Sequence, residues 1–91
     1  MIFRKRNRPF QKVEKNSTVL VLSGNEKEII TLNDTAFSIW NVCDGKSKEE
    51  IVSHIVELYN LNKDEFFETV KADCDEMINY LLENGLIKSE E

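Results

Sequence analysis

A series of helix-cap and turn signals divides this chain into short segments. Asn33 is a favourable N-cap, Asp44-Gly45 ends the helix that follows, Ser47 opens a second helix, and Gly85 is placed to end a third. Asn and Ser side chains accept hydrogen bonds from first-turn amides, and Gly adopts the left-handed conformation that closes a helix. In a chain of 91 residues, these signals predict one small domain with three helices after Asn33.

The part of the chain before Asn33 predicts three short strands. Residues 10–15, 18–22 and 28–32 contain β-branched or aromatic side chains, and the turn signals at 16–17 and 23–25 separate them. A sheet this small needs helices over one face. The sequence therefore predicts an α+β, winged-helix-like fold, in which a three-stranded antiparallel β-sheet is followed by three α-helices.

Charge is distributed unevenly along the chain. Residues 1–15 hold six basic residues against one acid, a net charge of +5, whereas the remaining residues hold six lysines against sixteen acids. We predict that residues 1–9 form a flexible basic N-terminal arm and that residues 10–88 form the folded domain. The arm either keeps the protein solvated or contacts an acidic partner, an anionic membrane or nucleic acid.

The third predicted helix argues against nucleic-acid binding, although a winged helix would use it as a reader of DNA. Residues 63–84 carry two lysines against seven acids, which a phosphate backbone would repel. No apolar segment approaches the length of a membrane span, and the first residues lack the apolar segment of a signal peptide. We therefore expect a cytoplasmic protein with no nucleic-acid or membrane partner.

The chain has few residues that could act as catalytic groups or metal ligands. Cys43 and Cys74 lie far apart on predicted apolar helix faces, and His54 is the only histidine. No zinc-ligand spacing, nucleophile–base pair or glycine-rich phosphate loop is present. The sequence therefore predicts no enzymatic activity, no metal and no cofactor, with both cysteines as small buried residues.

Taken in order, these motifs resemble a known family. Leu32-Asn33 with Thr35-Ala36, the apolar helix through Trp40, Asp44-Gly45, Ile51 in a capped helix, and Gly85-Leu86-Ile87 resemble the PqqD-like family, also called RiPP recognition elements. The resemblance covers roughly residues 10–87. It implies a chaperone that binds the leader segment of a ribosomally synthesised precursor peptide and presents it to a modifying enzyme, either a radical SAM maturase or a leader peptidase or cyclase.

The resemblance also implies where the leader would bind. In the family the leader adds as an extra strand beside the third strand, against the third helix, which is β-augmentation. Mapped onto this sequence, the peptide-binding residues are expected to be Glu28, Ile29, Ile30, Thr31, Phe66, Val70, Asp73, Cys74 and Met77.

Two alternatives remain at this stage. A winged-helix protein–protein interaction module without a role in peptide modification would have the same fold signals, because a fold does not fix a function. A DNA-binding regulator fits less well because of the acidic third helix. An unpaired strand edge would also permit a strand-swapped homodimer.

Overall fold

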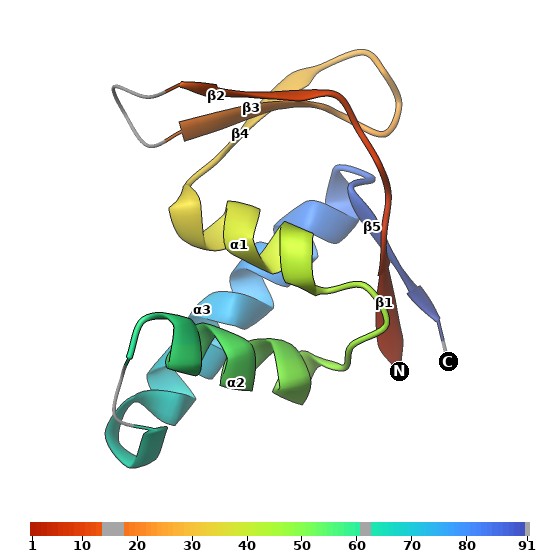
Figure 1. The fold of residues 1–91 in the computed structure, drawn as a ribbon. Coiled ribbons are helices and arrows are strands. Elements are labelled where there is room, and N and C mark those ends of the chain that lie inside the picture. The colour runs from red at the N-terminus through yellow and green to blue at the C-terminus, as the bar shows by residue number, and fades with distance from the viewer. Residues whose placement is uncertain (14–17, 61–62, 91) are drawn as a thin grey trace.

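The computed structural model describes residues 1–13, 18–60 and 63–90. A three-stranded antiparallel sheet of β2 (Phe10–Val13), β3 (Thr18–Leu22) and β4 (Ile29–Leu32) lies across one end of three helices (Figure 1). The helices are α1 (Asp34–Val42), α2 (Lys48–Leu58) and α3 (Lys63–Glu83). The α+β fold expected from the sequence, with three strands followed by three helices, is confirmed.

Alternation along the strands sets which face of the sheet meets the helices. On β3, Val19 and Val21 are buried, and on β4 the buried residues are Ile30 and Leu32. Side chains on the other face remain accessible, with Ile29 62% exposed. Because the strand order is β2-β3-β4, β2 and β4 are the two edges of this sheet.

The predicted helix caps are present. The Asn33 Oδ1 atom accepts from the Ala36 N–H at 2.8 Å at the start of α1. At the start of α2, Ser47 and Glu50 form a reciprocal capping box with distances of 3.3 and 3.0 Å. Gly85, at φ 71°, ends α3 in the left-handed conformation that Gly adopts without strain. These local signals fix where each helix begins or ends.

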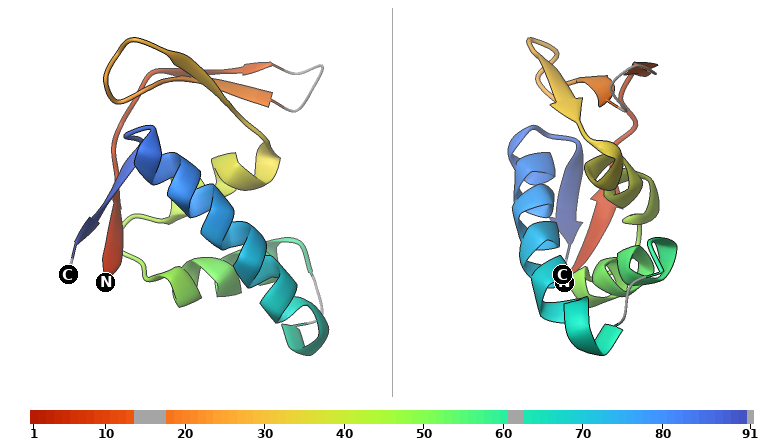
Figure 2. Two further views of the ribbon diagram at one scale, coloured as in Figure 1. Left: turned by 180° about the vertical axis from the view of Figure 1, so that it is seen from behind. Right: turned by 90° about the vertical axis from the view of Figure 1, so that its left-hand side faces the viewer.

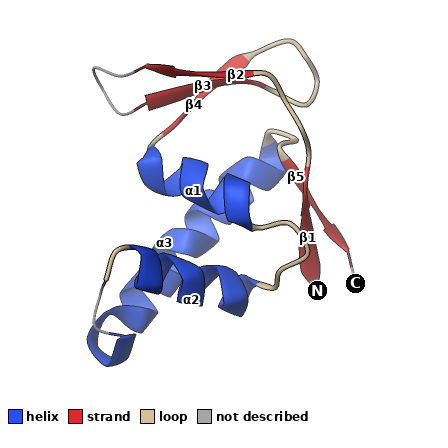
Figure 3. Cartoon of the chain, viewed as in Figure 1, coloured by secondary structure: helices blue, strands red, loops and turns tan. Residues whose placement is uncertain are grey.

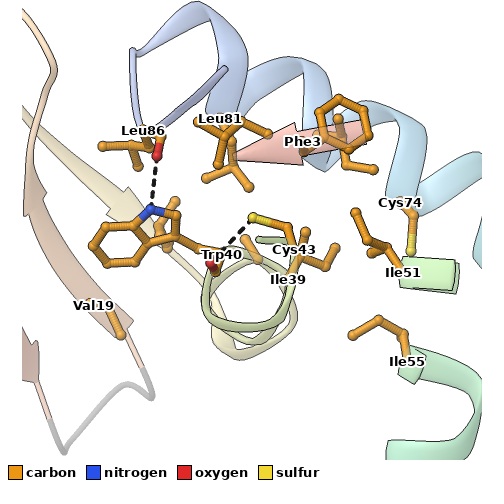
Figure 4. Close-up of a cluster of buried hydrophobic side chains, with 14 of the residues drawn as sticks. Phe3, Val19, Ile39, Trp40, Cys43, Ile51, Ile55, Cys74, Leu81 and Leu86 are labelled. Atoms are coloured by element: carbon orange, nitrogen blue, oxygen red, sulfur yellow. Dashed lines mark hydrogen bonds between the residues drawn. The ribbon is translucent and has the colours of Figure 1, made fainter. Parts of the chain in front are cut away.

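Trp40 joins α1 to the end of α3 at the centre of the core (Figure 4). Its side chain is 1% exposed, and its Nε1–H donates to the Leu86 carbonyl oxygen at 3.0 Å. The Cys43 thiol, also buried, donates to the Trp40 carbonyl at 3.3 Å. A buried indole needs a partner for its N–H, so this bond holds the chain after α3 against α1.

The N-terminal segment differs from the flexible arm that the sequence predicts. β1 (Ile2–Lys5) pairs with β5 (Ile87–Glu90) in a second, two-stranded antiparallel sheet beside the helices (Figures 2 and 3). Phe3 on β1 is 2% exposed and belongs to the core. The reason is a partner at the far end of the chain, which no local pattern reveals.

Three basic side chains of this segment also have intramolecular partners. Arg4 pairs with Glu90 at 3.0 Å, Lys5 lies over the Trp40 ring at 4.6 Å, and Arg8 donates to the Ser23 carbonyl at 2.9 Å. The predicted turn at 16–17 lies outside the described residues. No helix in the described ranges is long and apolar enough to cross a membrane.

Candidate functional site

Along one side, the backbone of β4 is not paired with another strand within the described part of the chain. The Ser23 N–H donates to the Glu28 carbonyl at 2.9 Å, which makes this a hydrogen-bonded pair of the β3–β4 ladder. Such pairs alternate with non-bonded pairs along an antiparallel ladder, so the N–H and C=O of Ile30 also face β3. The N–H and C=O groups of Ile29 and Thr31 therefore point outward, away from the sheet.

A contact with α3 supports this orientation. The Tyr80 hydroxyl donates to the Thr31 carbonyl oxygen at 3.5 Å. A carbonyl that reaches α3 must point away from β3, as the ladder requires. The distance is at the upper limit for a hydrogen bond, so the contact holds this edge only weakly.

The other edge of the sheet has features that discourage strand addition. Pro9 precedes β2, and the Lys12 ammonium lies 5.1 Å from the centre of the Phe37 ring, on the inner side of the sheet. Proline and inward-pointing lysine are common devices by which native sheets protect their edges. β4 contains neither proline nor a charged residue. Of the two edges, β4 is the one that lacks these protective features.

α3 runs antiparallel to β4 and provides the second wall of a groove. On one side of the Tyr80 contact, toward the end of α3, Glu83 and Glu28 line one polar hollow. On the other side, Met77 and Thr35 line a second hollow, which is apolar. The later residues of the helix thus face the earlier residues of the strand. We use the name β4–α3 groove for the space between β4 and α3 together with the two hollows at its ends.

The apolar hollow lies where the first turn of α1 meets α2 and α3. Its volume is about 280 Å³, roughly twice the ~150 Å³ cavity that accommodates a benzene molecule. It is lined by Thr35, Ile55, Tyr59, Val70, Asp73, Cys74 and Met77. One aromatic or aliphatic side chain of a bound peptide would fit there.

Cys74 forms part of this lining but is not a reactive group. The residue is 1% exposed, and burial raises the pKa of its thiol to about 11. A thiol with such a pKa stays protonated near neutral pH and is a poor nucleophile. Among the described residues, no three His, Cys, Asp or Glu side chains come together in a way that could hold a metal ion.

The structure brings most of the predicted peptide-binding residues to this groove. Four of them, Val70, Asp73, Cys74 and Met77, line the apolar hollow. On the opposite wall, Ile29 and Thr31 supply the outward backbone groups, as described above.

The other three predicted residues neither line the apolar hollow nor supply outward backbone groups of β4. Glu28 precedes β4, lines the polar hollow and uses its carbonyl within the ladder. Ile30 is 7% exposed and belongs to the core, with its backbone directed toward β3. Phe66 is 39% exposed and lies one turn before Val70, outside the lining of the hollow.

The prediction did not include Thr35, Ile55 and Tyr59 of the apolar hollow, Tyr80 between the two hollows, or Glu83 of the polar hollow. Tyr80 follows Met77 by three residues on the same face of α3, so helical spacing would have found it. Thr35, Ile55 and Tyr59 come from α1, α2 and the end of α2. Their meeting point depends on how the helices cross, which leaves no signal in the local sequence.

Comparison of the sequence with models of known protein families identifies the family of this chain. The family model for coenzyme PQQ synthesis protein D (PqqD) matches residues 18–87, from β3 to the start of β5 and well over half of the chain. The chain belongs to the PqqD family. Comparison with curated proteins and with solved structures gave no match. β1 and β2 lie before the matched range.

Membership of the PqqD family fixes the general role. PqqD proteins are non-catalytic chaperones that bind the precursors of ribosomally synthesised, post-translationally modified peptides, and membership implies a precursor peptide and a maturase as partners. The resemblance noted in the sequence is thereby confirmed, as is the expectation that this chain is not an enzyme.

Proposed function

We propose that this PqqD protein binds the leader segment of a precursor peptide as an additional strand on β4 and presents it to a modifying enzyme. The outward N–H and C=O groups of Ile29 and Thr31 carry the proposal. An added strand would exchange backbone hydrogen bonds with these groups, and its alternate side chains would enter the β4–α3 groove. Backbone pairing would supply affinity, and the hollows would set the register.

The apolar hollow supports this proposal with a site for an anchor residue. Val70 and Met77 offer an apolar wall, and the flexible Met77 thioether adapts to side chains of different shape. A single well-buried anchor commonly supplies much of the energy of a peptide interface. The leader would therefore carry one aliphatic or aromatic residue at the position that faces this hollow.

The Tyr80 hydroxyl would give way when the leader binds. It occupies the Thr31 carbonyl, the acceptor that an added strand needs, through a bond of 3.5 Å. Because that bond is long, exchanging it for a backbone N–H donor costs little. The ring would remain as part of the groove wall.

An NMR titration with precursor peptides encoded beside the gene tests the proposal. We expect the largest amide shifts at residues 29–31 and along the side of α3 that contains Met77 and Tyr80. Shifts confined to β2 or to the β1–β5 sheet would contradict binding at the β4 edge. Light scattering on the same samples would reveal a second copy of the chain at this edge, because a strand-swapped dimer would compete with the leader.

A further inference from the structure

The side of α3 that borders the β4–α3 groove carries acids and no cation among its described residues. Asp73, Glu76 and Glu83 are exposed, and none of them forms an ion pair with a described residue. Glu76 lies one turn before Tyr80 on the same side of the helix. By helical spacing, Lys71 lies on the opposite flank of α3. A peptide in this groove would therefore meet three exposed carboxylates along α3.

The polar hollow adds to this negative potential at one end of the groove. Glu28 from the strand side and Glu83 from the helix side both line it, at the point where α3 ends. The last turn of α3 contains no basic residue, so the partial negative charge of the helix C-terminus is not offset from within the helix. Arg6 is the only cation among the described residues that line this hollow. A Lys or Arg side chain of a bound peptide would be attracted here.

The distance between the two hollows sets a spacing on the peptide. From Cys74 in the apolar hollow to Glu83 in the polar hollow, α3 advances about 13 Å at ~1.5 Å per residue. An extended strand covers this distance in about four residues at ~3.3 Å per residue. An even spacing also places both side chains on the same face of the added strand, so both can enter the groove.

We propose that the groove selects cationic leader segments, in which an aliphatic or aromatic residue is separated by about four positions from a Lys or Arg. This inference rests on the proposed function, since it assumes a strand on β4. The apolar residue fills the hollow between α1, α2 and α3, and the basic residue reaches Glu28 and Glu83. The acids along α3 attract the segment before it docks, which raises the association rate more than the final affinity.

Selection from a phage-displayed library of short random peptides tests the inference without a known precursor. Peptides that are enriched on the wild-type protein but not on Thr31→Pro are ligands of the β4 edge. We expect these peptides to favour Lys and Arg over Asp and Glu near the predicted spacing from an apolar residue. If no peptide distinguishes the two proteins, the β4 edge itself is refuted. If such peptides are found but lack a basic preference, only the charge inference is overturned.

Charge reversal in the protein provides the second measurement. One selected peptide and its Lys-to-Glu counterpart are titrated by fluorescence anisotropy against wild type, Glu83→Lys and the matched control Glu68→Lys. Helical spacing places Glu68 on the side of α3 opposite Met77, away from the groove. We expect wild type to prefer the lysine peptide about tenfold at low ionic strength, and the preference to shrink as salt is added.

The two variants should then separate a local effect from a general one. Glu83→Lys is expected to abolish or invert the preference for the lysine peptide, whereas Glu68→Lys should retain it. Equal losses in both variants would overturn a specific role for the groove, because they would show that only the net charge of the protein matters. Circular dichroism of both variants would show that each remains folded.

Discussion

A proline at Thr31 would test the orientation of the β4 edge directly. The Thr31 N–H points away from β3, so Thr31→Pro removes a donor for an added strand and no hydrogen bond of the sheet. Proline is tolerated on edge strands when the missing N–H faces outward. We therefore expect the variant to fold, with a loss of no more than about 1 kcal/mol in the free energy of unfolding from the altered φ angle.

The same change should weaken leader binding substantially. One carbonyl of the bound peptide would lose its donor at the interface, and an unsatisfied buried polar group costs about 1–3 kcal/mol. At about 1.4 kcal/mol for each factor of ten, the dissociation constant should rise roughly five- to 150-fold. The proline ring would also obstruct the incoming strand, which increases the loss. Isothermal titration calorimetry with the leader, together with thermal unfolding followed by circular dichroism, measures both quantities.

Two further proline variants make this test sharp. Lys12→Pro removes an outward N–H from β2, the other edge of the sheet. The Leu22 N–H bonds to the Pro9 carbonyl, and bonded pairs alternate with non-bonded pairs along the β2–β3 ladder, so the Lys12 N–H points away from β3. We expect it to bind the leader as wild type does. Ile30→Pro removes an inward N–H and a core side chain and should lose several kcal/mol of stability. Normal binding by Thr31→Pro, with loss of binding in Lys12→Pro, would refute our assignment of the open edge.

Other variants and conditions probe the groove and the core. Tyr80→Phe should leave stability nearly unchanged and tighten leader binding about twofold, because it frees the carbonyl at the β4 edge; anisotropy would detect weaker binding if the hydroxyl instead helps to hold the peptide. Trp40→Phe should lower the free energy of unfolding by about 2–3 kcal/mol, because the smaller ring leaves a cavity and the hydrogen bond to the Leu86 carbonyl is lost. The Leu86 oxygen would still accept from the Arg6 backbone N–H, so it would not be left without a partner. Denaturation followed by circular dichroism measures this loss, since the chain has no other tryptophan. Burial raises the pKa of the Cys43 and Cys74 thiols to about 11, so stability present below pH 9 should fall as pH rises from 9 toward 11. Replacing either cysteine by Ala should reduce that fall in pH-dependent unfolding, and a fall of unchanged size would assign it to other groups.

Local sequence was sufficient where a structure depends on near neighbours. Asn33 caps α1, and Ser47 with Glu50 caps α2, because each bond joins residues three positions apart. Gly85 ends α3 because only glycine adopts its positive φ without strain. The order of strands and helices follows from these boundaries and from residue preferences. The candidate site was partly predictable for the same reason, since helical spacing places Val70 and Met77 on one side of α3.

Contacts between distant segments could not be predicted in this way. Phe3 is a core residue only because β1 meets β5 from the other end of the chain. The sequence predicts Gly24 only as a turn residue. In the structure a Cβ atom at this position would lie 2.8 Å from the Gly85 carbonyl oxygen, which is too close for any other residue without a shift. The Gly24 N–H also donates to the Asn84 carbonyl at 2.8 Å. This close approach fixes the β3–β4 turn against the end of α3 and so sets the width of the groove at that end.

The sequence by itself determined the fold class, the helix boundaries and the family to which the chain belongs. It also located a strand near residues 28–32, but strand propensity does not reveal which backbone groups are free. That depends on register: Ile29 and Thr31 face outward because the β3–β4 ladder places Ile30 in a bonded pair. Tertiary structure alone decided that this open edge faces an acidic wall of α3, because the pairing of strands and the crossing of helices are set by contacts far apart in the chain.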